Sequence, residues 1–196
     1  GKVLRSAFKQ AVTDGLIPSN PFATAIPKTT TVAGKTNRRG VFTSAELRML
    51  LEAAQRRSKD WHTVVLVGIY TGARLRDCCR IEWEDIDLAE ATLSLHQLKT
   101  GSRIQIPIHP ALLEHLEALA SQAGDQAAAF LTLALAEAET GGAHGLSLQF
   151  AAIMREAGVS AGKITSGTRR KQNERGFHSL RQSWETRPRL MFAWWA

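Results

Sequence analysis

Apolar residues recur at the spacing of an amphipathic helix in four stretches of this chain. The first covers residues 3–12 and is followed by Gly15, a residue type that often ends helices. The second begins with Thr43-Ser-Ala-Glu46, the pattern of a capping box, in which the hydroxyl and the carboxylate satisfy backbone N–H groups. The last two begin at Pro110 and at Leu146. The pattern therefore predicts four helices.

Two further segments differ from these helices. Residues 61–70, WHTVVLVGIY, are apolar nearly all round, which fits either a buried strand or a buried helix, and periodicity does not distinguish the two. The segments TLSLHQL and RIQIPI alternate between apolar and polar residues, with KTGS between them, and predict a β-hairpin. Pro107 lacks a backbone donor, so we expect the second strand at a sheet edge. The predicted fold class is mainly α with a small antiparallel β-sheet (α+β).

Residues 18–42 have the composition of an extended linker. They contain three prolines and several threonines but few large apolar residues. Their charges are four basic residues and no acid. We therefore expect a helix in residues 1–17, a basic linker in 18–42 and the main domain in 43–196.

The basic excess of the chain is concentrated near its C-terminal end. Of 196 residues, 44% are hydrophobic, which is ordinary for a globular chain, and the net charge is +7. Eight basic residues and two acids lie between Lys163 and Arg189, so this segment accounts for most of the excess. A local basic cluster favours contact with phosphates; the alternative is a solvated basic loop. The residues expected to contact DNA are Lys163, Arg169, Arg170, Lys171 and Arg175, together with Arg38 and Arg39 of the linker.

Several classes of protein are excluded by the absence of their motifs. No apolar run reaches the roughly 18 residues of a membrane helix, and the first residues have no signal-peptide pattern. Cys78 and Cys79 are adjacent, so no disulfide framework is expected, and a reducing, cytoplasmic setting fits best. The sequence contains no complete P-loop, no dinucleotide-binding glycine motif, no GxSxG element and no metal-binding spacing. No cofactor and no metal are expected.

A set of cations and one imidazole remains as candidate chemistry. Arg74 follows TGA directly after the apolar segment, Lys99 begins the hairpin turn, and His178 and Arg181 share one face if their segment is helical. Two guanidiniums can hold one phosphate, a lysine can protonate a leaving oxygen, and a histidine can assist proton transfer. Taken singly, each is more often an ordinary surface residue.

Taken together, these segments resemble a known family. TGARLRD (71–77), IEWEDIDL (81–88), HQLKTGSRIQIPI (96–108) and FHSLR (177–181) are similar, in order and spacing, to the signature segments of the tyrosine recombinases, the phage-integrase family. LIPSNPF followed by FTSAEL resembles the junction between that family's core-binding and catalytic domains. The resemblance runs from about residue 3 to residue 181. It implies that residues 1–17 hold the last helix of a core-binding domain and that residues 43–196 are a catalytic domain, C-terminally incomplete.

The resemblance also implies a reaction. A tyrosine attacks a phosphodiester of double-stranded DNA, forms a 3′-phosphotyrosine and releases a 5′-hydroxyl, so that strands are broken and rejoined for site-specific integration or excision. It assigns phosphate binding to Arg74 and Arg181, donation of a proton to the leaving 5′-oxygen to Lys99, and assistance in proton transfer to His178. Asp77 matches an acidic residue that holds site side chains in place, although a plain surface carboxylate fits its sequence position equally well.

The segment after Arg181 departs from the family. Gln182 stands where a histidine is usual, and SWETRPRLMFAWWA does not resemble the segment that carries the family's tyrosine. The single tyrosine, Tyr70, lies in the apolar segment and is expected in the core. We therefore expect a bacterial or phage-encoded recombinase chain whose nucleophile is missing through natural truncation, frameshift or shortening. Its apolar tail suits self-association. The alternatives are a non-catalytic DNA-binding relic that regulates an intact recombinase, and a plain basic helical domain.

Overall fold

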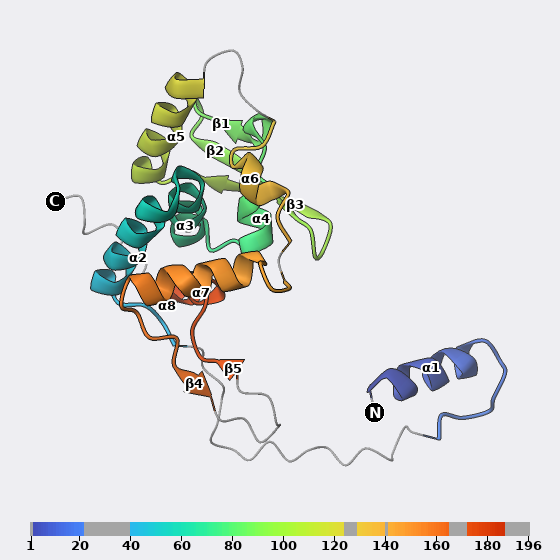
Figure 1. Ribbon diagram of the computed structural model, residues 1–196. Helices are drawn as coiled ribbons and strands as arrows, with labels where there is room; N and C mark the ends of the chain where they lie inside the picture. Colours follow the sequence, from blue (N-terminus) through green and yellow to red (C-terminus); the bar gives the residue numbers. More distant parts are fainter. Residues whose placement is uncertain (1, 22–39, 124–128, 140, 165–171, 187–196) are drawn as a thin grey trace. The chain divides into compact units, whose positions relative to one another are not determined.

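The computed structural model divides the chain into two compact units, Gly1–Arg38 and Arg39–Ala196. The structure describes residues 2–21, 40–123, 129–139, 141–164 and 172–186 (Figure 1). The first unit holds helix α1 (Lys2–Thr13). The prediction of a helix there is confirmed. Gly15 has a φ of +72°, which a residue without a Cβ adopts most readily, as expected for a residue just beyond a helix end.

The second unit is mainly helical, and its helices begin where local sequence signals place them. Helix α2 (Ser44–Arg57) starts with the predicted capping box, because the Thr43 side chain accepts from the Glu46 N–H and the Glu46 carboxylate accepts from the Thr43 N–H. Helices α5 (Pro110–Ala123) and α7 (Leu146–Glu156) occupy the other two predicted stretches. Helix α8 (His178–Thr186) covers the segment that carries the H-x-x-R pair. The remaining helical segments are α3 (Lys59–Thr71), α4 (Leu75–Cys79), α6 (Leu133–Ala136) and the 3-10 turn η1 (Trp83–Asp85).

A small antiparallel sheet lies beside the helices. Its strands are β1 (Ile86–Asp87), β2 (Thr92–Gln97) and β3 (Ser102–Pro107), in the order β1-β2-β3. The predicted hairpin is confirmed, with Gln97 paired to Ser102 at its turn, and Pro107 lies in an edge strand. A second antiparallel pair joins β4 (Lys163–Ile164) to β5 (Gln172–Asn173). A helix-rich fold with a small antiparallel sheet is therefore confirmed.

The apolar segment that periodicity left open is the central helix. Helix α3 begins because the Ser58 side chain accepts from the Trp61 N–H, and it ends at Gly72, which has a left-handed φ of +63°. It contacts α2, α4, α5, α6 and α8, and Figure 1 shows it in the middle of the second unit. Because protein surrounds α3, residues on all its faces are buried, and an amphipathic stripe has no reason to appear in its sequence.

Helix α8 packs closely on α3 because α3 carries a glycine at the contact. A Cβ added to Gly68 would lie 2.5 Å from Phe177 Cζ and 3.1 Å from Leu180 Cδ1. Phe177 and Leu180 are both buried. Farther along α8, the Ser183 hydroxyl accepts from the Phe42 N–H at 2.8 Å and donates to the Ser179 carbonyl. Contacts with α3 and with Phe42 thus hold α8 in place within the second unit. Among the described residues, no helix has the length and apolar character needed to span a membrane.

Candidate phosphate-binding site

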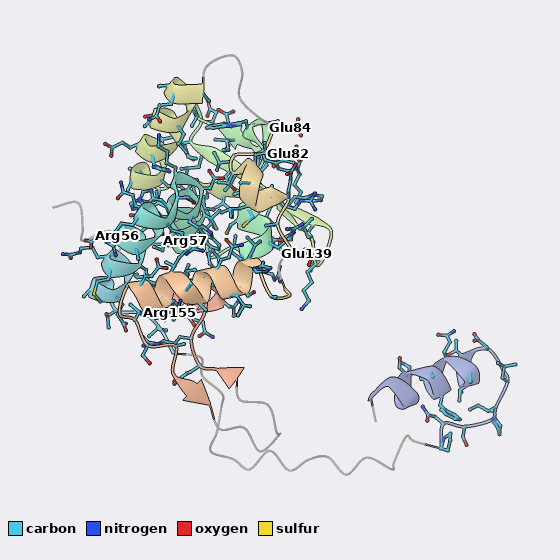
Figure 2. All side chains as sticks on the ribbon, in the orientation of Figure 1. Arg56, Arg57, Glu82, Glu84, Glu139 and Arg155 are labelled. Carbon is cyan, nitrogen blue, oxygen red and sulfur yellow. The ribbon has the colours of Figure 1, made fainter. Side chains whose placement is uncertain are left out.

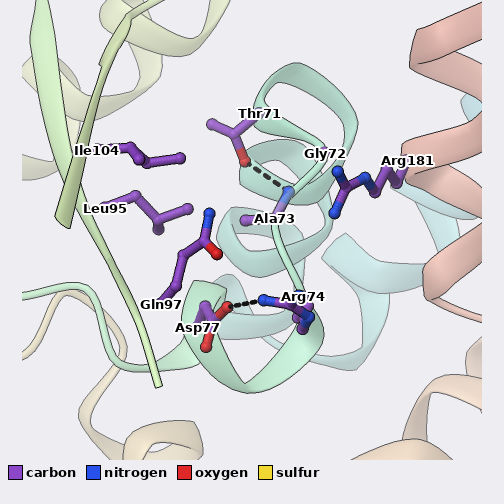
Figure 3. A pocket seen from close by; sticks show the side chains of 9 residues that line it. All are labelled: Thr71, Gly72, Ala73, Arg74, Asp77, Leu95, Gln97, Ile104 and Arg181. Carbon is purple, nitrogen blue, oxygen red and sulfur yellow. Dashed lines mark hydrogen bonds and ion pairs between the residues drawn. The ribbon is translucent and has the colours of Figure 1, made fainter. Parts of the chain in front are cut away.

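A cavity of about 100 Å³ opens where α3, α4, the sheet and α8 meet. Figure 3 shows side chains converging on it from each of these elements. The volume is several times the roughly 10–15 Å³ that one water molecule needs, so the cavity can receive a small anionic group. Its lining consists of Thr71, Gly72, Ala73, Arg74, Asp77, Leu95, Gln97, Ile104 and Arg181.

Arg74 enters the cavity from the start of α4. Gly72 ends α3 with a left-handed backbone, and the chain turns directly into α4, of which Arg74 is the N-cap. The Arg74 side chain is 34% exposed and pairs with the Asp77 carboxylate, with 3.5 Å between Nη1 and Oδ2. A guanidinium that uses one N–H group in an ion pair and has others open to solvent can still donate to a bound anion.

Asp77 connects α4 to the hairpin. Its side chain is 3% exposed, and Oδ1 accepts from the Leu98 N–H at 3.3 Å. Oδ2 is buried, faces Arg74 and has no hydrogen-bond partner beyond that ion pair. A buried carboxylate is stable only beside a positive charge or a donor, so Asp77 fixes both the guanidinium of Arg74 and the strand end next to Lys99.

Arg181 reaches the cavity from α8, across from Arg74 (Figure 3). The contact again involves a glycine, because a Cβ on Gly72 would lie 3.3 Å from Arg181 Cγ and 3.6 Å from its Cα. The left-handed φ of Gly72 therefore serves two purposes: it turns the chain toward Arg74 and leaves room for α8. The structure thus brings together three predicted site residues, Arg74, Asp77 and Arg181.

The other two predicted site residues do not line this cavity. Lys99 is exposed in the turn between β2 and β3, and His178 is exposed at the start of α8. Lys99 follows β2, which lines the cavity through Gln97, and His178 lies on α8, which lines it through Arg181. Their roles stay predictions.

Of the residues expected to contact DNA, only Arg175 has a described side chain. Its guanidinium donates to Glu46 at 2.7 Å and lies over the Phe42 ring, 5.4 Å from the centroid. These contacts join the segment before α8 to the start of α2. Lys163 lies in β4. Arg38, Arg39, Arg169, Arg170 and Lys171 lie outside the described residues.

Gln97 is a lining residue that the sequence reasoning missed. It is the last residue of β2 and stands two positions before Lys99. A neutral amide in a polar hairpin carries no distinctive signal, so only its strand position, on the same face as the core-facing Leu95, could have indicated it.

The single tyrosine does not line the cavity. Tyr70 lies on α3, and its ring stacks on His109, with centroids 4.4 Å apart and 16° between the planes. Burial raises the pKa of its hydroxyl above the ordinary value of 10.0. A stacked phenol with a raised pKa is a packing residue and a poor nucleophile.

A pair of histidines outside the cavity gives the fold a pH dependence. His62 on α3 and His115 on α5 meet edge to face, with ring centroids 5.0 Å apart. The Thr63 hydroxyl donates its one proton to the Lys59 carbonyl, so it accepts from His115 Nε2 at 2.8 Å. Burial, and secondarily the charge of His62, lowers the pKa of His115 from 6.5 to about 4, and burial also lowers the pKa of His62.

We expect the free energy of unfolding to fall as the pH drops from 6.5 to about 4. In this window the unfolded chain binds a proton at His115 that the folded chain does not, so the stability is fully present above pH 6.5 and is lost on acidification. His115→Gln keeps a hydrogen-bond donor for Thr63 but has no group that titrates in this window. It should therefore reduce the loss of unfolding free energy by about 1–2 kcal/mol, a value lowered because the ring is partly exposed. Urea unfolding of the parent and of His115→Gln at pH 7.5 and pH 4.5 measures the loss in each. Equal losses in the two proteins would show that His115 does not cause the pH dependence.

Within the described parts of the chain, no three His, Cys, Asp or Glu side chains are grouped so that they could hold a metal ion. The polar groups that line the cavity are two guanidiniums, a carboxylate, an amide and the Thr71 hydroxyl. Guanidiniums bind phosphate and carboxylate groups through paired charge-assisted hydrogen bonds. The arrangement can hold one anion from two sides.

The sequence and the structure were each compared with known proteins, and both comparisons find integrases. The sequence model described as the phage integrase family matches residues 40–187. The integrases of enterobacteria phage 434 and of Escherichia phage lambda are each 33% identical over 105 residues, which is 53% of this chain and 27% of theirs. The chain thus spans about a quarter of the length of these relatives. A structure of a lambda integrase dimer bound to a COC′ core site has a TM-score of 0.61 and 24% identity, covering 97% of this chain and 65% of that one.

Proposed function

The chain belongs to the phage integrase family, and we propose that its second unit is the phosphodiester-binding part of a site-specific DNA recombinase. The observation that carries this proposal is the cavity in which Arg74 and Arg181 meet, although 107 positions separate them in the sequence. The lambda integrase structures similar to this chain include ones bound to DNA, which supports double-stranded DNA as the partner.

The two arginines hold the phosphate between them. Each guanidinium donates to non-bridging oxygens, which fixes the phosphorus and stabilises the added negative charge of a pentacoordinate transition state. Asp77 binds no phosphate in this scheme, because its carboxylate is negatively charged, and it pairs with Arg74 instead. It keeps the Arg74 side chain directed at the cavity and holds the Leu98 backbone at the base of the hairpin turn.

We assign proton transfer to the two exposed residues, Lys99 and His178, which follow or share lining elements of the cavity. Lys99 donates a proton to the 5′-oxygen as the P–O bond breaks, and His178 assists proton transfer at the phosphate. Their exposure in the structure without DNA is compatible with these roles, since DNA covers the cavity mouth when it binds. The basic segments around Arg38 and Arg169 add contacts with the DNA backbone, and α1 is the last helix of a core-binding domain. The apolar residues 190–195 suit self-association.

A second candidate function, DNA binding without cleavage, is favoured by the position of Tyr70. The family's reaction needs a tyrosine oxygen that attacks the phosphorus, and the one tyrosine of these 196 residues is packed against His109 and does not line the cavity. We propose that these residues by themselves bind DNA and form no covalent adduct with it.

A nicked suicide duplex separates the two functions. We expect the 196-residue protein to bind the duplex but to form no adduct that survives boiling in detergent, because its one tyrosine, Tyr70, stacks on His109 and does not line the cavity. Gel electrophoresis of labelled DNA measures the adduct. An adduct that disappears in Tyr70→Phe would identify Tyr70 as the nucleophile and contradict the proposal of binding without cleavage. Failure to bind DNA at all would contradict both functions.

A further inference from the structure

We infer that Gln97 is a further substrate-contacting residue of this site: its amide nitrogen donates to the phosphodiester held by Arg74 and Arg181, and its amide oxygen fixes the turn that carries Lys99. The inference rests on the proposed function, since it presumes that a phosphodiester occupies the cavity. The inference goes beyond the proposed function because it adds a neutral hydrogen-bond donor from the sheet to the two cationic groups from the helices.

The position of Gln97 places its amide where an anion would lie. It lines the cavity together with Arg74 and Arg181, and Figure 3 shows its amide end between Leu95 and Ala73. Arg74 approaches from the start of α4 and Arg181 from α8, and Gln97 supplies a neutral polar side chain from β2. The other neutral polar side chain of the lining, Thr71, already donates to the Val67 carbonyl and accepts from the Ala73 N–H. An anion between the guanidiniums would therefore have a third donor on its sheet side.

The hydrogen bonds of the turn determine which end of the amide is available. The Thr100 hydroxyl donates to Gln97 Oε1 at 3.1 Å and accepts from the Ser102 N–H at 3.5 Å. With its oxygen engaged by the turn, the amide presents Nε2, which has two donors and no acceptor. Phosphate oxygens accept hydrogen bonds and donate none, so the exposed end of the amide matches a phosphodiester and adds no charge.

The same residue ties the cavity to the position of Lys99. The Gln97 carbonyl accepts from the N–H groups of Thr100 at 3.1 Å and Gly101 at 2.8 Å, which closes the turn. Gln97 therefore contacts the residue that directly follows Lys99 through both its backbone and its side chain. A phosphate that orders the Gln97 amide also orders this turn, and with it the lysine proposed to protonate the leaving oxygen.

The test uses dimethyl phosphate, the smallest phosphodiester, added to the ¹⁵N-labelled protein. We expect the Gln97 side-chain NH₂ signals to shift with the same dissociation constant as the Arg74 and Arg181 Nε–H signals. This measurement needs no variant, so it does not depend on whether a variant folds. Gln97 signals that stay unmoved while both arginine signals shift would overturn the inference and leave the proposed function intact.

Variants separate the donor from the turn. Gln97→Glu keeps the shape of the side chain and an oxygen for Thr100 but removes the donor, and we expect it to weaken dimethyl phosphate binding by about tenfold or more. Gln97→Ala removes both the amide donor and the oxygen that accepts from Thr100, and it should weaken dimethyl phosphate binding by about tenfold. His96→Glu adds the same negative charge one residue away, on the opposite face of the strand, and is the matched control for charge; we expect its effect to be less than about twofold.

Three results are decisive. Losses in both Gln97 variants, with His96→Glu near the parent, support the inference. Equal losses in Gln97→Glu and His96→Glu, with Gln97→Ala unchanged, would assign the effect to charge and overturn it. No loss in Arg74→Ala and Arg181→Ala would show that the cavity holds no phosphodiester, which would overturn the proposed function and the inference together.

Discussion

Gly68→Ala should lower the free energy of unfolding by about 1–2 kcal/mol and displace α8 from the cavity. The new Cβ would lie 2.5 Å from Phe177 Cζ, and Phe177 has no space to move into, because it is 6% exposed and its ring meets that of Phe150 with centroids 5.1 Å apart. Overpacking of this kind costs about 1–3 kcal/mol, and the better helix propensity of alanine returns up to about 1 kcal/mol. Urea unfolding measures the net loss.

The consequence for the site separates this prediction from a general loss of stability. Helix α8 carries Arg181, so its displacement should weaken binding of dimethyl phosphate even where the protein is fully folded. Gly176→Ala is the matched control: it lies directly before Phe177, but a Cβ there meets no atom within 4 Å. A Gly68→Ala protein as stable as Gly176→Ala, with unchanged phosphate affinity, would contradict the close packing of α8 on α3.

Arg74→Ala and Arg181→Ala should each weaken DNA binding by about tenfold at moderate salt, because each removes a charge-assisted hydrogen bond to phosphate. The double variant should lose less than the product of the two, since both side chains hold one phosphate. The plot of log affinity against log salt concentration has a negative slope. Its magnitude should decrease by about 1 in the double variant, as expected for one lost phosphate contact. Fluorescence anisotropy of a labelled duplex across a salt series measures both quantities.

Arg57→Ala is the control for a general loss of positive charge. Arg57 lies on α2, pairs with Glu156 at 3.4 Å and does not line the cavity; Figure 2 shows it near Arg56. We expect its effect on affinity to be less than about twofold. If Arg57→Ala weakened binding as much as Arg74→Ala, the affinity would come from diffuse charge and not from the cavity. Affinity that did not change with salt would contradict phosphate contact altogether.

The elements that the sequence predicted are those with local signals. The capping box at Thr43 and the alternation of strands β2 and β3 need only neighbouring residues, and the structure confirms both. Periodicity does not identify helix α3, because its residues are apolar on all faces, and they are so because five helices contact it. The short helices α4 and α6 were not predicted, since four or five residues are too few to show a helical period.

The sequence predicted those site residues that lie in the motifs of the family it resembles. Arg74, Asp77 and Arg181 lie at the cavity, but nothing in the sequence showed that the cavity itself excludes Lys99 and His178 or includes Gln97. The pairing of Arg175 with Glu46 joins residues 129 positions apart, and such a pairing cannot be inferred from charge patterns along the chain. Gly68 and Gly72 matter through contacts with α8, a helix more than 100 residues later in the sequence.

The position of a DNA phosphate relative to Arg74 and Arg181 tests the central claim most directly. A crystal structure of the 196-residue protein on a DNA duplex would provide it. We expect one backbone phosphate in the cavity, with non-bridging oxygens about 2.7–2.9 Å from nitrogens of both guanidiniums. A duplex bound across another face, with the cavity open to solvent, would contradict the account.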